Sequence, residues 1–512
     1  MGHIEIGDLK EFDAFLRTRC TEVRAKLRDE LAGHKLTLAV ARRHRVLLPM
    51  VGVYTPGWQA LPACSWEYVE LVTHEGLIGT GEWSIQLDQP AIDALHRLAN
   101  DPDQNLLDDD LEIPLFMAWW DLVGQVLGKP LHRLWADLFD VGFTPSAEIP
   151  LAAYTWQRFA DAEGRDAVTY ESWPQFAAQQ CAEGYRTLKI SMSSYEPEDH
   201  IGLIRRLREA IPPDIEIRVD THGSWNFMEA RRILPALEPL DISYIEQPFN
   251  ALMPDRFYPR GVAPPPHGPG GYQREYYFRK LEELRAHTTI PFSCHWWTPP
   301  IVQPAGAHRM SNAWSFDWYM IKRYDPVDIA VPDIGLGVFG LWRLLQMARF
   351  MGLHIALHSN FELGLQSSFR AAMFSTLGYY PETTGLYLGA TPRLCMAMDT
   401  EYNQVRDDVL VGGKLPVSGG HLVLSADPGH GLRLDRDRLE RYAYTDDAVR
   451  GHRAFAQRLY DEYVLDKPRR KTMAGWPKRP GPERVGRRVY PYDVTGVLGI
   501  GEVQEIDVEL NT

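Results

Sequence analysis

A set of polar side chains lies at the ends of short apolar runs in the middle of the chain. They are Lys189 and Ser191 (TLKIS), Asp220 and His222 (RVDTH), Glu246 (YIEQPF), His295 (SCHWW), Asp333 (AVPDIG), and His358 and Asn360 (ALHSNF). Asp220 and Glu246 end neighbouring runs, and two adjacent carboxylates repel each other unless a cation lies between them. Because Mg²⁺ prefers oxygen ligands, this pair predicts a divalent cation site.

A cation at that place can bind a substrate carboxylate and stabilise the enediolate that forms when the α-proton leaves. The base then has to come from another run. His358 is the candidate base. Asp333 ends the apolar run that precedes the run of His358, and a carboxylate on the preceding strand can orient and polarise the imidazole. The pattern indicates removal of a proton next to a carboxylate.

The apolar runs that carry these residues alternate with helical stretches from about residue 148 onward. They include IPLAAYTW, RTLKIS, IEIRVD, ISYIEQ, PFSCHW, VDIAVP and LHIALHS. Repeated alternation of strand and helix predicts a closed barrel of parallel strands, in which the polar strand ends meet at one mouth. No GxGxxG loop follows any of these runs, which argues against a dinucleotide-binding fold.

Five segments are distinguished by their patterns. Residues 1–45 predict a helical extension, residues 46–147 an α+β unit, residues 148–400 the barrel with its metal site, residues 401–466 a C-terminal segment, and residues 467–512 a basic, Pro/Gly-rich tail. We expect the tail to wrap the surface or a neighbouring subunit.

The bulk composition favours a small-molecule partner. A formal net charge of -14 repels phosphate backbones and anionic lipid, so nucleic acid and membranes are not expected partners. The five cysteines are scattered, without a CxxC pair or a disulfide framework, which fits a reducing compartment. The N-terminus lacks the apolar core of a signal peptide, and no run approaches the roughly 20 apolar residues of a membrane span. We therefore expect a soluble, cytoplasmic protein.

Several of these motifs occur in the order found in a known family. DTHGSW, IEQPF and ALHSN resemble the strand-end motifs of the enolase superfamily, in its mandelate racemase and glucarate dehydratase branch. AMDTEYN and GGHLVLSADPGHGLRLDRDRL are similar to that branch's C-terminal segment, so the resemblance runs from about Trp66 to about Tyr442. It implies a modified TIM-type (β/α)7β barrel with an N-terminal α+β capping domain at 46–147, to which residues 401–466 return.

The resemblance also implies roles for individual residues. Asp220 and Glu246 would bind Mg²⁺, Asp333 and His358 would form the catalytic dyad, and Asn360 would lie in the substrate pocket. The third ligand in the family is an oxygen donor, whereas the matching position here is His295. Because imidazole is softer than Mg²⁺ prefers, His295 either favours Mn²⁺ or another divalent cation or does not bind the metal. Tyr154 and Ser191 are further candidates for the substrate pocket.

A second departure bears on the reaction. The family's KxK motif reads Lys189, Ile190, Ser191, so serine replaces the second lysine, which acts as a base. Losing that base favours dehydration of an acid sugar (aldonate or aldarate type), with His222 or His358 assisting departure of the hydroxyl group. Lys189 either neutralises the metal-binding carboxylates or serves as a second base. The alternatives are a racemase or epimerase of the same superfamily, and an inactive barrel with a binding or structural role. We expect a homo-oligomer that binds a small carboxylate.

Overall fold

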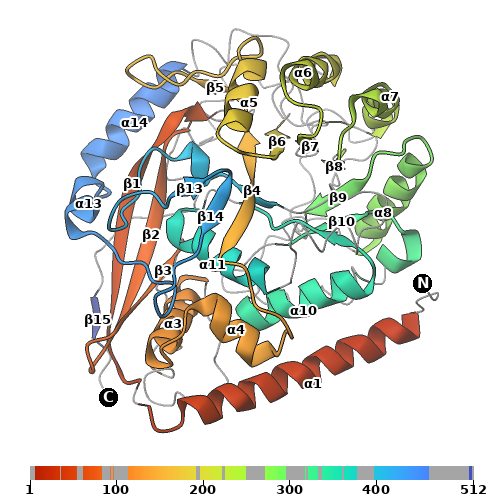
Figure 1. Cartoon of the computed structure of the whole chain (residues 1–512). Helices are drawn as coiled ribbons and strands as arrows, with labels where there is room; N and C mark the ends of the chain where they lie inside the picture. The colour runs from red at the N-terminus through yellow and green to blue at the C-terminus, as the bar shows by residue number, and fades with distance from the viewer. Residues whose placement is uncertain are drawn as a thin grey trace.

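A computed structural model of the 512-residue chain describes residues 6–34, 36–54, 61–83, 93, 96, 113–191, 197–221, 225, 227–249, 271–295, 318, 321–332, 337–359, 362–376, 397–459 and 507–509. Two domains lie side by side, a capping domain at the left of Figure 1 and a strand-and-helix barrel at its right.

The capping domain is an antiparallel sheet covered by two helices. Strands β1 (Leu38–Tyr54), β2 (Leu61–Thr73) and β3 (Ile78–Glu82) pair in sequence order, and helices α3 (Ile113–Val126) and α4 (Leu131–Phe139) follow. Helix α3 is apolar on nearly all sides, as expected for a helix enclosed in a core. It approaches β3 at glycines: a Cβ atom added to Gly81 would lie 1.8 Å from the carbonyl oxygen of Pro114. Glycine is therefore required at this contact.

The barrel consists of parallel strands that pair in the order of the sequence. They are β4 (Glu148–Thr155), β6 (Thr187–Ser191), β7 (Glu216–Asp220), β8 (Tyr244–Glu246), β9 (Phe292–His295), β10 (Ile329–Val331) and β11 (His354–Ile355). The eighth strand, β12 (Met398–Thr400), pairs with β4. On its other side the Asp399 N–H donates to the Leu357 carbonyl, 3.2 Å away and just beyond β11. This bond joins the two ends of the parallel sheet, and the predicted (β/α)7β barrel with its capping domain is confirmed.

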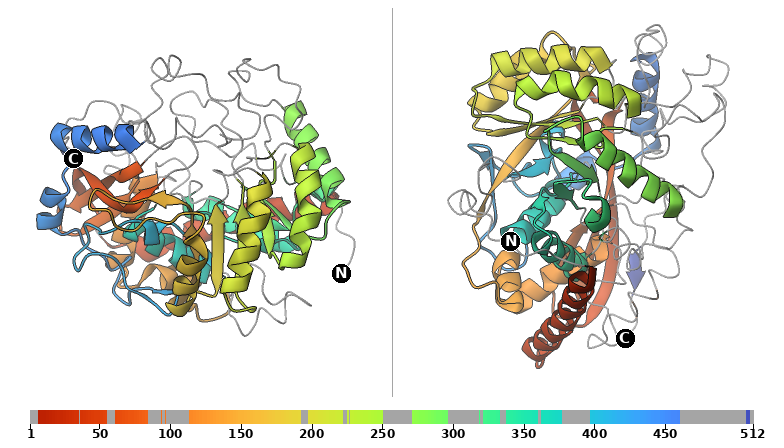
Figure 2. Two further views of the ribbon diagram at one scale, coloured as in Figure 1. Left: turned by 90° about the horizontal axis from the view of Figure 1, so that it is seen from above. Right: turned by 90° about the vertical axis from the view of Figure 1, so that its right-hand side faces the viewer.

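The helices of the barrel lie outside its strands (Figures 1 and 2). They are α5 (Trp173–Ala182), α6 (Pro197–Ala210), α7 (Phe227–Leu237), the 3₁₀ turn η1 (Glu238–Leu240), α8 (Gly271–Arg285), α10 (Gly337–Phe350) and α11 (Gly364–Ser375). Apolar strand residues such as Ile190, Val219 and Ile245 are fully buried in the main core. The strands thus turn one apolar side toward the helices, which leaves the other side for the barrel interior.

Both ends of the chain extend the two domains. Helix α1 (Ile6–Leu31) runs below the barrel in Figure 1, where Phe12 stacks on Phe350 of α10 with ring centroids 4.1 Å apart. The helical prediction for residues 1–45 extends too far, because β1 begins at Leu38. After β12 the chain forms η3 (Tyr402–Gln404), and then β13 (Val417–Ser418), β14 (His421–Val423), α13 (Arg436–Arg441) and α14 (Asp446–Leu459).

This C-terminal segment returns to the capping domain. Bridges join Val46 to Ala443 and Met50 to Val405, and β5 (Arg158–Phe159) also pairs with β1. Of the predicted tail, residues 507–509 are described, and they form β15 (Asp507–Glu509), antiparallel to Val40–Arg42 of β1. The capping sheet therefore contains strands from both ends of the chain.

A buried acidic cluster joins the capping domain to helix α11. The Glu82 carboxylate of β3 accepts the N–H groups of Leu363 and Gln366, the second at 3.0 Å. Asp408 accepts the Gly364 N–H at 2.9 Å and the hydroxyls of Tyr68 and Tyr402 at 3.0 and 2.8 Å. Burial raises the pKa of both carboxyl groups. We call Glu82, Asp408 and these donors the α11 joint.

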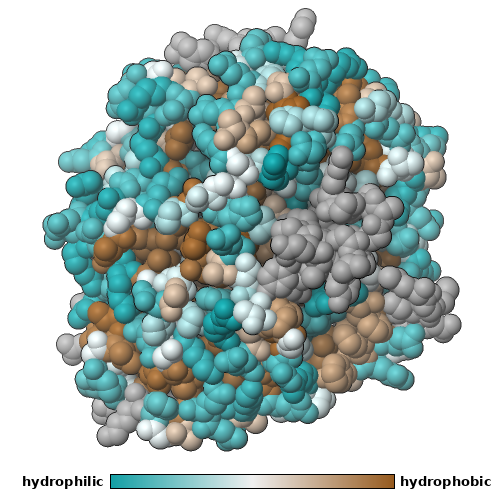
Figure 3. Space-filling model, viewed as in Figure 1, coloured by the Kyte–Doolittle hydropathy of each residue, from teal (hydrophilic) through white to brown (hydrophobic). Residues whose placement is uncertain are grey.

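The visible face in Figure 3 is mainly hydrophilic with scattered apolar residues. Large exposed apolar side chains among the described residues are Phe15, Met228, Val411, Val417 and Val423. Within the described part of the chain, no helix has the length and apolar character needed to cross a membrane.

Candidate active site

Strand register directs the predicted site residues to the barrel interior. Lys189 pairs with Tyr154 on one side and Arg218 on the other, and two residues further along Asp220 pairs with Ser191 and Glu246. Paired residues of parallel strands face the same side, and side chains alternate along a strand. All of these side chains therefore share one face of the sheet.

The Lys189 ammonium group lies among carboxylates from three other strands. Its Nζ is 2.9 Å from Oε2 of Glu246 on β8, 2.7 Å from Oδ2 of Asp399 on β12, and 3.6 Å from Oδ2 of Asp220 on β7. The lysine and all three acids are buried. We call these four residues the barrel cluster.

Two members of the surrounding network were not predicted from the sequence. Asp399 sits in the eighth strand and also accepts a 2.9 Å bond from Nη1 of Arg218. Arg218 in turn contacts Glu216 at the amino end of β7. The available signal was a charged residue in the interior of a short strand, as in EIRVD (Glu216–Asp220) and MDT (Met398–Thr400).

Charge and burial oppose each other within the barrel cluster. Burial lowers the pKa of the Lys189 ammonium, but the charges of Asp399, Glu246 and Asp220 outweigh it and raise that pKa well above its usual value. Burial raises the pKa of Glu246 to about 8, with Lys189 lowering it and Asp220 raising it. A lysine held in its charged form neutralises the carboxylates and is poorly suited to accept a proton.

Tyr154 and Ser191 lie beside the metal-ligand candidate Asp220. The Tyr154 hydroxyl donates to Oδ2 of Asp220 at 2.5 Å, and its ring centroid is 4.7 Å from Nζ of Lys189. Tyr154 is 1% exposed, so its hydroxyl supports Asp220 from within the barrel, and its contact with a substrate stays a prediction. Ser191 pairs with Asp220 and is also buried.

His358 continues the inner face of the barrel beyond β11. Its N–H donates to the Pro332 carbonyl at 3.0 Å, as the Ala356 N–H does to Ala330 at 2.9 Å, which prolongs the parallel ladder. Ala356 packs in a small interior cluster with Tyr244. By alternation His358, which is half-buried, belongs to the same inner face.

Several predicted site residues cannot be placed. His222, Asp333 and Asn360 lie outside the described residues, and only the backbone of His295 is described. The backbone of His295 on β9 pairs with Val331 of β10. Ser293, two residues earlier on β9, pairs with Glu246 of β8. Among the described residues no group of three or more His, Cys, Asp or Glu side chains is arranged to hold a metal. The two carboxylates Asp220 and Glu246 nevertheless fit the oxygen-donor preference of a hard divalent cation.

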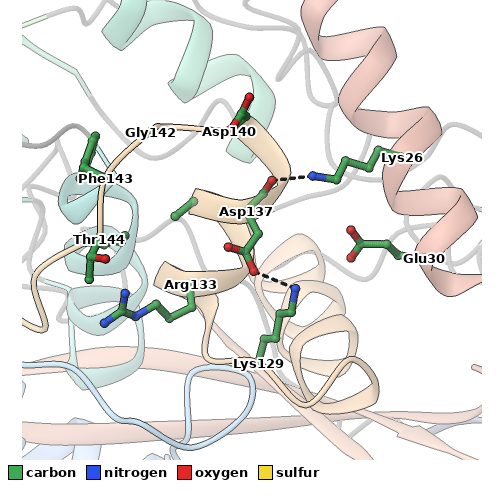
Figure 4. A pocket seen from close by; sticks show the side chains of 11 residues that line it. Lys26, Glu30, Lys129, Arg133, Asp137, Asp140, Gly142, Phe143 and Thr144 are labelled. Atoms are coloured by element: carbon green, nitrogen blue, oxygen red, sulfur yellow. Dashed lines mark hydrogen bonds and ion pairs between the residues drawn. The ribbon is translucent and has the colours of Figure 1, made fainter.

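A pocket of about 470 Å³ lies elsewhere, where α1 meets α4 and residues 140–145 (Figure 4). Within it Lys129 contacts the Asp137 carboxylate at 2.7 Å, and Lys26 donates to the backbone carbonyl of Asp137 at 2.6 Å. No residue of the candidate active site lines it. This pocket belongs to the packing of the N-terminal helix.

Comparisons with known proteins agree with this architecture. Residues 174–256 match the family model described as enolase C-terminal domain-like. The chain is 22% identical to a probable glucarate dehydratase of Streptomyces coelicolor, over 63% of each chain. It is also 22% identical to an arabinonate dehydratase of Saccharolobus solfataricus, over 64% of this chain and 70% of the relative. The first match thus spans less than two thirds of that relative's length.

Solved structures share the fold. An enolase from Thermobispora bispora, complexed with magnesium and formate, is 18% identical with a TM-score of 0.57, covering 86% of this chain and all of that one. An N-succinyl Arg/Lys racemase from Bacillus cereus is 18% identical with a TM-score of 0.55, covering 80% and 99%.

The chain combines a capping domain with a (β/α)7β barrel that has acidic residues at the ends of its third and fourth strands. Together with the family match over residues 174–256 and the relatives, this architecture shows that the chain resembles the enolase superfamily, in its mandelate racemase and glucarate dehydratase branch.

Proposed function

We propose that this protein is a divalent-cation-dependent lyase that removes the proton α to the carboxylate of an acid sugar and then eliminates a β-hydroxyl group. The observation that carries the proposal is the buried pair Asp220 and Glu246, in register at the carboxyl ends of adjacent strands. His358 supports it because it lies at the end of another strand on the same inner face.

Asp220 and Glu246 would hold the cation, with His295 as the proposed third ligand. A divalent cation bound there supplies positive charge that stabilises the substrate carboxylate as it becomes an enediolate. His358 would remove the α-proton, oriented by Asp333, and His222 or His358 would protonate the departing hydroxyl. Asn360 and Ser191 would contact the substrate.

The state of Lys189 favours dehydration over racemisation. Racemisation needs two bases on opposite faces of the carbon. The Lys189 ammonium is already bound between Glu246 and Asp399, at 2.9 and 2.7 Å, which is the geometry of a counter-ion for these carboxylates. Serine at position 191 removes the other candidate base. The two dehydratases among the relatives agree with this choice of reaction, and acid sugars are the substrate class that their names suggest.

A racemase or epimerase is the second candidate, favoured by the structural similarity to the N-succinyl Arg/Lys racemase. The two candidates differ in their products. A racemase returns substrate that carries solvent deuterium with inverted configuration, whereas a dehydratase yields a 2-keto-3-deoxy acid. An inactive barrel would do neither. Cytoplasmic location and homo-oligomeric assembly remain predictions.

The test is α-proton exchange in deuterium oxide against a panel of sugar acids, with Mg²⁺ or Mn²⁺ supplied. We expect exchange by the wild type, a loss of about 10²- to 10⁴-fold in His358→Gln, and loss of bound metal in Asp220→Asn. Arg285→Lys, at the amino end of the strands, serves as a control because Arg285 pairs with Asp328 away from the mouth. A wild type that binds no divalent metal and exchanges no proton would contradict the proposal.

A further inference from the structure

We propose that Arg370 is a positioning residue that fixes the backbone of His358 in the geometry needed for proton transfer. The identity of His358 as the base rests on the proposed function, whereas the positioning itself rests on contacts in the structure. Arg370 lies on α11 and is 2% exposed.

The guanidinium group of Arg370 binds three backbone carbonyls from two strand ends. Its Nη2 donates to the carbonyls of Leu357, at 3.2 Å, and His358. It also donates to the Asp399 carbonyl on β12 at 3.3 Å. Arg370 therefore ties together the two strand ends at which the barrel closes.

A second set of bonds holds the residue after His358. The Ser359 hydroxyl is 2.9 Å from both carboxylate oxygens of Glu362, and it accepts the Glu401 N–H at 2.7 Å. Glu362 also forms an ion pair with Nη1 of Arg370. With the His358 N–H bound to Pro332, both peptide groups of His358 are fixed, one by β10 and the other by α11.

The carbonyl of Leu357 already accepts the Asp399 N–H, and Arg370 adds a second donor to it. Buried carbonyls beyond a strand end are costly without a donor. The two terminal nitrogens of Arg370 act at the same time, since Nη1 pairs with Glu362 while Nη2 binds the carbonyls. A lysine ammonium is a single point charge and cannot occupy both places. A base displaced by about 1 Å loses about 10²-fold in rate, so an unanchored His358 would be a slower base in an intact protein.

The competing explanation is that Arg370 only neutralises the buried charge of Glu362. Arg370→Lys separates the two explanations, because lysine keeps the ion pair and gives up most of the carbonyl contacts. If neutralisation is the whole role, Arg370→Lys keeps both the stability and the rate of α-proton exchange of the wild type. If Arg370 positions His358, Arg370→Lys keeps the stability but loses rate.

The experiment measures kcat and KM for α-proton exchange, together with thermal stability, in wild type, Arg370→Lys and the control Arg285→Lys. We expect Arg370→Lys to melt close to the wild type, with kcat lowered about 10- to 100-fold and KM within about twofold. An unchanged kcat would overturn the proposal. Should Arg370→Lys fail to fold, the charge-free double variant Glu362→Gln/Arg370→Met gives the same test, with the same loss of kcat expected.

Amide hydrogen exchange of the substrate-free protein tests the positioning without any activity. We expect faster exchange of the amides of residues 357–359, 362 and 363 in Arg370→Lys than in wild type, and wild-type exchange there in His358→Gln. Protection equal to the wild type in Arg370→Lys would overturn the proposal. If no carboxylate substrate exchanges its proton even with the wild type, the proposed function fails, yet this measurement still decides whether Arg370 holds the segment.

Discussion

Two buried acidic clusters in this protein are satisfied in different ways. In the barrel cluster, Asp220, Glu246 and Asp399 surround the Lys189 ammonium, and Arg218 binds Asp399 from behind. In the α11 joint, carboxylates are bound by backbone N–H and tyrosine hydroxyl groups. The positive charge of the Lys189 ammonium can be supplemented by a metal cation or exchanged for one. The backbone N–H donors of the α11 joint are fixed by the fold. The difference suggests that the first cluster serves chemistry and the second serves domain docking.

The largest effect is expected from Lys189→Met. Removing one partner of a buried ionic network costs about 3–5 kcal/mol, because the remaining charges are left uncompensated. The free energy of unfolding by urea measures this cost. The double variant Lys189→Met/Asp399→Asn should recover part of it, since one carboxylate charge is removed. If the barrel cluster accepts exchangeable cations, excess Mg²⁺ will stabilise Lys189→Met more than it stabilises the wild type.

The α11 joint should respond differently to Asp408→Asn. In asparagine an NH₂ group replaces one carboxylate oxygen and cannot accept a bond. In place of Oδ2 it loses the bonds from Gly364 and Tyr402, and in place of Oδ1 it loses those from Tyr68 and Val409. We expect a loss of about 1–3 kcal/mol in the free energy of unfolding, and no recovery with Mg²⁺. Tyr68→Phe, which removes a single hydroxyl, should cost less. A rescue of Asp408→Asn by Mg²⁺ would erase the distinction between the two clusters.

Lys414, next to the α11 joint, predicts a pH dependence of the stability. Burial lowers the pKa of Lys414 to about 8, so between pH 8 and the unfolded value near 10.5 the unfolded chain binds more protons. Stability contributed by this group therefore rises with pH across that window. The wild type should gain about 1–2 kcal/mol relative to Lys414→Met between pH 7 and 9.5, measured by urea unfolding. A constant difference would contradict the depressed pKa.

The smallest effect is expected from Tyr154→Phe. The Tyr154 hydroxyl bonds to Asp220 at 2.5 Å and orients a proposed metal ligand. Removing such a supporting donor weakens metal affinity by about tenfold or more, while the ring keeps its packing against Trp156. Calorimetric titration with Mn²⁺ measures the change. Equal affinity in both proteins would mean that the hydroxyl supports Asp220 only structurally.

The sequence predicts what depends on local pattern. Alternating apolar strands and helices gave the barrel, and Asp220 and Glu246 lie in register as expected from two adjacent strand ends. Asp399 could not be recognised as a member of the barrel cluster, because its partner Lys189 is 210 positions away in the sequence. The sequence alone does not distinguish a buried aspartate from an exposed one. The start of β1 was also misjudged. Charged residues such as Arg43 of β1 are also typical of the solvent-exposed face of a helix. In the fold the Arg43 side chain pairs with Glu67 of β2.

The pairing of β15 with β1 bears on the order in which the protein assembles. Each barrel strand from β4 to β11 pairs with its predecessor, so that sheet can grow as the chain leaves the ribosome. The capping sheet is different, because the outer edge of Val40–Arg42 receives residues 507–509, nearly the whole chain later. Contacts so distant in sequence form slowly. The edge of β1 at Val40–Arg42 can therefore pair with β15 only after residues 507–509 have been synthesised.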